Sequence, residues 1–267
     1  YCFANPLWHE TGHKTAFKSK FLNEFFYYVS SYLANFEPIR WRYTHFVHHG
    51  NTYSTENPFD YEIEYGNNLK ETPKNLIINL IPFMELVFFK RSVAYEIILH
   101  ALGIKTKVMQ NSIPENARAK AILYSRIYVA IWLAIILWSI LSASWLPVLL
   151  FLLPKYYGRT LHKLVSFTQH AGLARDIKDH RLTTREMYLN PVLSFLYWKM
   201  EYHLTHHMFP TVPSYNLDKL HHHIKDQLPR TNKGLIDAYK EIIPAIIKQS
   251  KEEDYFLKKD IPQLQNV

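Results

Sequence analysis

The 267-residue sequence contains a single cysteine, Cys2. One cysteine excludes an internal disulfide, a thiolate zinc site and a cysteine-held iron–sulfur cluster within the chain. It also favours a reducing compartment. Only seven glycines are present, which argues against a protein of sheets and tight turns. A glycine-rich dinucleotide-binding fingerprint after a strand is also missing, so the sequence offers no such site for a redox cofactor.

A concentrated basic stripe is likewise absent. The net charge of +8 comes from 31 Lys and Arg against 23 Asp and Glu, and these residues are scattered along the chain. Because no base-reading motif accompanies them, nucleic-acid binding is not expected. Aromatic residues make up 15 % of the sequence, a content familiar in proteins that meet a membrane interface.

Histidine, by contrast, is abundant and patterned. Eight of the 15 histidines lie in three boxes, which are HxxxH at His9 and His13, and HxxHH at residues 45–49 and 203–207. Chance would give one HxxHH about 0.05 times in a chain of this composition. On a helix, positions i, i+3 and i+4 share one face. Each HxxHH box is therefore expected to present three imidazoles to a common point.

The number of histidines indicates more than one metal ion. His170, in a short segment after the long apolar run, adds a ninth imidazole to the eight in the boxes. A single zinc ion takes four ligands, so nine are too many for one ion, whereas two ions with four or five nitrogens each would use them all. Imidazole binds iron, copper, nickel and zinc alike, so the ligand type alone does not choose the metal.

The long uncharged run from Ile127 to Leu153 predicts where the chain crosses a membrane. If the boxes build one site, the number of crossings between the second and third boxes must be even. We therefore expect a hairpin, from Ala119 to Leu141 and from Trp145 to Val165. Both of its ends carry positive charge, as expected for cytosolic ends; the charged residues are Arg118, Lys120 and Arg126 at the start and Lys155, Arg159 and Lys163 at the end.

The flanking segments complete the expected architecture. Asn75 to Leu102 is apolar but interrupted by charges, which favours interfacial helices. Met187 to Tyr202 is expected to be a helix carrying the last box, and residues 217–267 a soluble helical tail without chemistry. Because residue 1 is tyrosine and Phe3 to Trp8 reads like the end of an apolar segment, we interpret the chain as a fragment lacking an upstream membrane helix.

The order of these features resembles one family. HxxxH, then HxxHH, a membrane hairpin, a lone histidine and a second HxxHH followed by Phe209-Pro210 are similar to the integral-membrane fatty acid desaturase and hydroxylase superfamily. The resemblance implies one domain over 1–267, an all-α integral-membrane bundle whose cytosolic helical cap carries the boxes. It also implies a non-haem centre of two iron ions. By carry-over the iron ligands are His9, His13, His45, His48, His49, His170, His203, His206 and His207.

The resemblance also implies the reaction and its partners. It predicts an oxygen-dependent desaturase that introduces a double bond into a fatty acyl lipid, in a multi-pass membrane protein with its active site on the cytosolic face. A hydroxylase or other monooxygenase acting on a lipid or alkane is the close alternative. Electrons must come from a separate donor, a ferredoxin, a Rieske protein or a small cytochrome with its reductase, because the chain has no such centre. A metal-binding or metal-transport membrane protein ranks third, because its ligands should lie within the crossings.

Carboxylates near the boxes are expected to hold the outer ring nitrogens of the histidines. The preferred candidates are Asp60 and Asp176; the others are Glu10, Glu62, Asp179 and Glu201. In some family members an asparagine four residues before the lone histidine holds a metal-bound water, and here that position is Ser166. The remaining histidines are expected to be packed, interfacial or at the polar surface; these are His100, His162, His180 and the run His221, His222 and His223.

Overall fold

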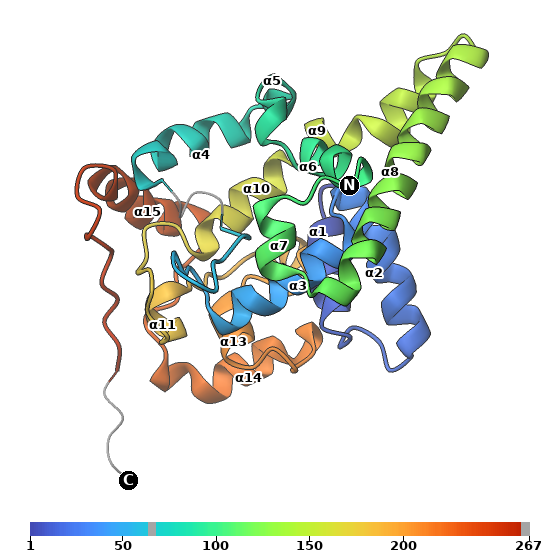
Figure 1. The fold of residues 1–267 in the computed structure, drawn as a ribbon. Coiled ribbons are helices and arrows are strands. Elements are labelled where there is room, and N and C mark those ends of the chain that lie inside the picture. The colour runs from blue at the N-terminus through green and yellow to red at the C-terminus, as the bar shows by residue number, and fades with distance from the viewer. Residues whose placement is uncertain (64–67, 263–267) are drawn as a thin grey trace.

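The computed structural model describes residues 1–63 and 68–262. Within these residues the chain folds into helices joined by short turns and loops, with one isolated bridge between Met187 and Asn232 and no strand. The expected all-α class is therefore confirmed. Most helices gather into one body, from which α8 projects at the upper right of the view (Figure 1).

Three short helices carry the boxes and meet in the middle of this body (Figure 1). They are α1 (Ala4–Gly12), α3 (Pro38–Gly50) and α13 (His203–Met208). Local chemistry fixes where α3 begins, because the Glu37 carboxylate accepts hydrogen bonds from the backbone N–H groups of Ile39 and Arg40 at 3.0 and 2.6 Å. Pro38 stands at its first turn, where proline is favoured.

Between the first two boxes, α2 (Lys20–Ala34) packs against α1. Ser19 caps its start, and Asn35 ends it in the left-handed conformation with φ 62°. Trp8 and Tyr27, both buried, form the centre of this contact at a ring distance of 6.3 Å. The Tyr27 hydroxyl also donates to the Pro38 carbonyl at the start of α3 at 2.6 Å, which links this contact to the helix that carries the second box.

One helix, α8 (Glu115–Leu141), is long and apolar enough to cross a membrane. It coincides with the first arm of the expected hairpin, and the chain then turns at Ala143 with φ 47°. The second arm is not the continuous helix that we expected. It consists of the π-helical turn Val148–Leu152, α9 (Pro154–Tyr157) and α10 (Thr160–Ser166). Pro154 separates the π-helical turn from α9, because proline lacks the N–H that an inner helical turn requires. The break between α9 and α10 falls at Gly158 and Arg159.

The segment after the second box forms short helices, in keeping with the interfacial helices expected there. These are a 3₁₀ turn (Leu69–Glu71), α4 (Thr72–Leu80), α5 (Met84–Val87), a 3₁₀ turn (Phe89–Arg91) and α6 (Val93–Ala101), followed by α7 (Lys107–Ser112). Large apolar side chains on this segment are exposed, among them Ile77, Phe83 and Val87. Contiguous exposed apolar groups of this kind mark an interaction surface.

The approach to the third box differs from the single helix expected over Met187 to Tyr202. Only α12 (Pro191–Leu196) is helical there, and α11 (His180–Thr183) precedes it. Trp198 and Lys199 both adopt positive φ, 55° and 58°, which breaks the helical path. The last box therefore starts a helix of its own at His203.

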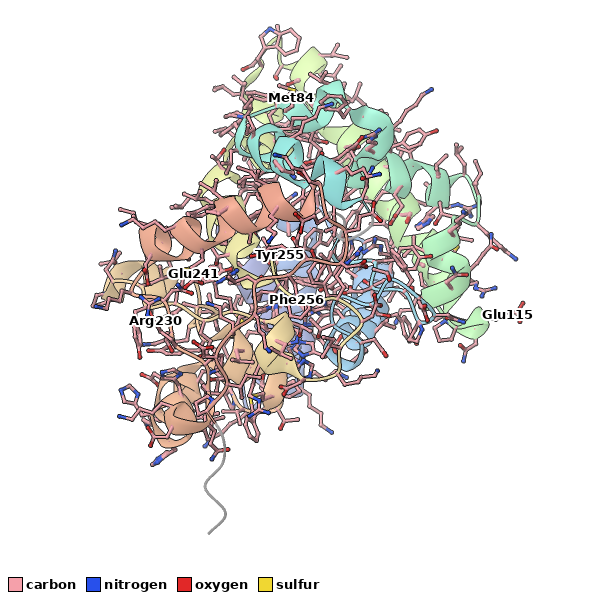
Figure 2. All side chains as sticks on the ribbon, turned by 90° about the vertical axis from the view of Figure 1, so that its left-hand side faces the viewer. Met84, Glu115, Arg230, Glu241, Tyr255 and Phe256 are labelled. Carbon is pink, nitrogen blue, oxygen red and sulfur yellow. The ribbon has the colours of Figure 1, made fainter. Side chains whose placement is uncertain are left out.

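The C-terminal helices α14 (Leu217–Ile224) and α15 (Leu235–Gln249) follow the box. One face of α15 lies in the main hydrophobic core, through Ala238, Ile242 and Ile246. Its outer face pairs Glu241 with Arg230 at 3.2 Å, on the left of the view and below Met84 (Figure 2). The tail thus helps to cover the box helices instead of standing apart from them.

Candidate metal centre

Five of the predicted ligands form one group. They are His9, His13, His45, His49 and His206, contributed by the end of α1, by α3 and by α13, and one ring nitrogen of each lies within 4.8 Å of the others. The inward atoms are Nε2, with His9 and His206 2.6 Å apart and His13 and His45 2.8 Å apart. Four of the five rings are buried and His13 is half-buried.

The other four form a second group. They are His48, His170, His203 and His207, all buried, again with one nitrogen of each within 4.8 Å of the rest. The Nε2 atoms of His170 and His207 each lie 3.1 Å from His203 Nε2. The two groups adjoin, since the rings of His49 and His207 stack at 4.3 Å.

Each HxxHH box is divided between the groups, which corrects the expectation of one common point. His45 and His49 face the first group and His48 the second, whereas His203 and His207 face the second and His206 the first. The helical period explains the division. A residue four positions on is rotated by about 40° one way, and a residue three positions on by about 60° the other. In each box the first and last histidines therefore point to one side of the helix stripe, and the middle histidine points to the other side.

The electrostatics of the groups fit metal ions. Burial lowers the pKa of His206, and nearby His45 and His48 lower it further; burial, assisted by His48, lowers that of His170 to about 3. The rings of His206 and His170 are therefore neutral at pH 7, as ligands must be. Neutral imidazoles whose Nε2 atoms converge leave buried lone pairs without donors, and a cation satisfies them. Nine nitrogen donors in two groups suit two metal ions.

Two carboxylates contact the outward-facing Nδ1 atoms of two histidines on α3. Asp60 lies 2.8 Å from His48 Nδ1 and Glu62 lies 3.0 Å from His45 Nδ1. Burial opposes charge on His48, but Asp60 outweighs it and raises the His48 pKa. The same contact outweighs burial of Asp60 and lowers its pKa. Asp60 therefore stands where it was expected.

The other candidates contact different groups. Asp176 accepts hydrogen bonds from the backbone N–H and hydroxyl of Thr55, both at 2.7 Å, and Asp179 pairs with Arg181 at 2.7 Å. Glu201 accepts from the Ser194 hydroxyl, and Glu10 from Thr15 and from the backbone N–H of Ser214. Glu10 thus ties the first box to the turn after the third.

Three outer partners were missed from the sequence because they are not carboxylates. His170 Nδ1 lies 2.9 Å from the Thr183 carbonyl, and His207 Nδ1 lies 3.0 Å from the Thr52 hydroxyl. The Gln169 side-chain amide lies 3.2 Å from His203 Nδ1. Thr52 follows His48 by four residues and Gln169 directly precedes His170, so closeness to a ligand histidine was the available signal.

A buried pair behind the third box was also missed. Glu186 accepts a hydrogen bond of 2.6 Å from the backbone N–H of Thr205, inside the box, and its other oxygen lies 2.8 Å from His221 Nδ1. His221 is 1 % exposed, so placing it on the polar surface was wrong. Its neighbours His222 and His223 are exposed as expected, because consecutive residues fan round α14.

We expect Glu186→Ala to lower iron content and thermal stability, while Glu186→Gln restores most of both. Alanine leaves the buried Thr205 N–H without its acceptor, which costs about 1–3 kcal/mol, whereas glutamine still offers a carbonyl oxygen. Thermal unfolding and iron content per chain measure the difference. Equal losses in both variants would assign the effect to the carboxylate charge beside His221.

A cavity of about 510 Å³ opens beside the histidines. His9, His48, His170 and His203 line it, so members of both groups face it. Its remaining walls come from α1, α3, α10 and the interfacial segment α4 to α6. Trp8 and Trp41 supply aromatic surface near the histidines, and α4 and α10 supply polar side chains.

These features define a helical protein with two adjoining groups of histidines, suited to metal ions, beside a cavity with both apolar and polar walls. The chain belongs to the fatty acid desaturase family, whose model matches residues 1–239. It is 23 % identical over 245 residues to the Delta(5) fatty acid desaturase fat-4 of Caenorhabditis elegans, covering 79 % of this chain and 52 % of that protein. The chain thus spans about half the length of this relative. None of the solved structures matches it.

Proposed function

We propose that the protein is an oxygen-dependent di-iron membrane desaturase that introduces a double bond into a fatty acyl chain. One observation carries the proposal. Nine imidazoles, eight of them buried, lie in two adjoining groups beside a cavity whose walls are partly apolar. Membership of the fatty acid desaturase family supports an acyl substrate and dioxygen. The domain extends over the whole of 1–267.

The proposed chemistry is a balanced four-electron reduction of dioxygen. Two bound iron ions would supply activation of dioxygen. The acyl chain loses two hydrogen atoms, which amount to two protons and two electrons, while an external donor gives two more electrons and the solvent two more protons, so that two waters form. The protein's own part is to hold the ligands and place the acyl chain, because a displacement of about 1 Å can cost roughly a hundredfold in rate. Asp60 and Glu62 fix the orientation of His48 and His45.

The lining of the cavity suggests how an amphiphile lies in it. The aromatic rings of Trp8 and Trp41 stand near the histidines, whereas Asn75, Asn79 and Lys163 stand on α4 and α10. An apolar chain therefore extends toward the histidines and its polar group toward α4 and α10. This orientation brings carbon atoms, not the head group, to the metal ions.

The remaining partners follow from topology and composition. A multi-pass arrangement with the histidines at the cytosolic face needs an even number of crossings between the second and third boxes. The exposed apolar side chains of α8 and of α4 to α6 support contact with lipid. A ferredoxin, a Rieske protein or a small cytochrome docks through its acidic surface on the basic cytosolic face.

Mass analysis of lipids from cells that express the protein tests the proposal, together with metal analysis of the detergent-purified chain. We expect about two iron ions per chain and a product lighter by two hydrogens. A product heavier by one oxygen would establish the hydroxylase instead. Zinc at one ion per chain with unchanged lipids would overturn the enzyme and leave a metal-binding protein.

A further inference from the structure

The four-histidine group is held from outside at every ring. Each Nδ1 atom has a neighbour, which is Asp60 for His48, the Thr183 carbonyl for His170, the Gln169 amide for His203 and the Thr52 hydroxyl for His207. Thr52 and Asp60 come from the loop after the second box, and Gln169 and Thr183 from either side of the loop that follows His170. They fix the rotation of the rings before any metal binds.

Two of the partners also fix the tautomer. A carbonyl only accepts, so His170 Nδ1 must carry the proton that it donates to Thr183. The Thr52 hydroxyl donates to the His48 carbonyl at 2.6 Å, which leaves its lone pairs to accept from His207 Nδ1. Both rings therefore present an unprotonated Nε2 inward, in the form that a metal ion requires.

The rings of the five-histidine group have fewer outer partners at Nδ1 than the rings of the four-histidine group. Among the residues that the structure describes, His45 has an outer partner, Glu62. The Nδ1 atoms of His49 and His206 are buried and have no hydrogen-bond partner in the described part of the chain. His13 lies just after the end of α1 and is half-buried. A metal bound here forces protons onto two buried Nδ1 atoms with nothing to receive them.

We propose that the two metal sites are unequal, and that the five-histidine site releases its ion first. The inference rests on the proposed function for the identity of the metal. An outer partner is worth roughly 10- to 100-fold in metal affinity. The four-histidine site has a partner that accepts from Nδ1 on three of its rings, which are His48, His170 and His207, whereas the Gln169 amide N–H donates to His203 Nδ1. The five-histidine site has one accepting partner, Glu62, and two buried Nδ1 atoms without a partner in the described part of the chain. The five-histidine site has one more nitrogen donor than the four-histidine site. That additional donor is either half-buried His13 or a ring whose Nδ1 has no outer partner among the described residues.

Release of iron to a chromogenic chelator measures the difference directly. The full chain is purified in detergent, loaded with ferrous iron under anaerobic conditions and mixed with an excess of chelator, and the coloured complex is followed with time. We expect two phases of about one iron each, with rates at least roughly tenfold apart. The readout is independent of turnover.

Paired variants assign the phases to the sites. Thr52→Val removes the acceptor of His207 and should accelerate the slow phase by roughly tenfold or more, while Thr55→Val, whose hydroxyl contacts exposed Asp176, should change neither. Glu62→Gln weakens the hold on His45 and should accelerate the fast phase alone. If Thr52→Val does not fold, Glu62→Gln still assigns the fast phase.

The outcomes separate this inference from the proposed function. A single phase of two irons, or acceleration of the slow phase by Glu62→Gln, would overturn the inequality while leaving the di-iron desaturase intact. Two phases in a protein that leaves lipids unchanged would support the inequality and overturn the desaturase. A chain that binds no iron would overturn both.

Discussion

Replacing His206 by alanine is expected to abolish activity and to reduce iron content to one ion per chain or less. His206 lies in the middle of the five-histidine group, where its Nε2 is 2.6 Å from that of His9 and 3.2 Å from that of His49. The ring is fully buried, so water cannot replace it as a ligand without opening the packing. Metal analysis and the lipid assay measure the two losses.

The matched control is His222→Ala on α14. His222 is exposed, and its Nδ1 lies 2.7 Å from the Asp218 carbonyl of the same helix. Its loss should leave iron content and product formation unchanged. If His222→Ala were as damaging as His206→Ala, the separation of the metal-facing histidines from the surface ones would be wrong.

The sequence predicted which histidines converge but not how they are shared. The HxxHH spacing is sufficient to place three rings on one stripe of a helix, and all nine candidates do gather. Which of them face the same group depends on the angle at which α3 and α13 approach each other. That angle is set by packing between residues far apart in the chain, which local periodicity does not contain.

The outer partners show the same limit. Asp60 was predicted because it follows the second box in a short polar loop, and it does contact His48. Asp176 met the same criterion after His170, yet its carboxylate pairs with Thr55 across the fold. His221 looked like one of three surface histidines until Glu186 was found opposite it. A contact 35 residues away along the chain leaves no trace in spacing.

Proline and backbone conformation explain the misplaced helices. The second hairpin arm was expected from apolar composition, but Pro154 divides it, and a second break falls at Gly158 and Arg159. Before the third box, the positive φ values of Trp198 and Lys199 end the expected helix. Nothing in those two residue types favours that conformation, so tertiary packing imposes it.

Ser166→Trp is expected to lower turnover by roughly a hundredfold or more while leaving about two irons bound. Ser166 ends α10 and lines the cavity four residues before His170. The serine is half-buried, and its hydroxyl lies 3.5 Å from the Lys163 carbonyl. An indole at this position occupies the space through which an acyl chain must reach the histidines, and it replaces no ligand.

Ser166→Ala separates occupation of the cavity from loss of the hydroxyl. Alanine keeps the cavity open, so its effect measures what the hydroxyl itself contributes, including any water that it orients for the metal ions; we expect a loss below about tenfold. Turnover and iron content are measured on both variants. If the tryptophan variant retained full turnover with its iron in place, the acyl chain would have to approach by another route, and the cavity between α4 and α10 would not be the substrate site. If instead the tryptophan variant lost its iron, the indole would have displaced His170 or His203. A change in the cavity wall would then move the metal ligands as well.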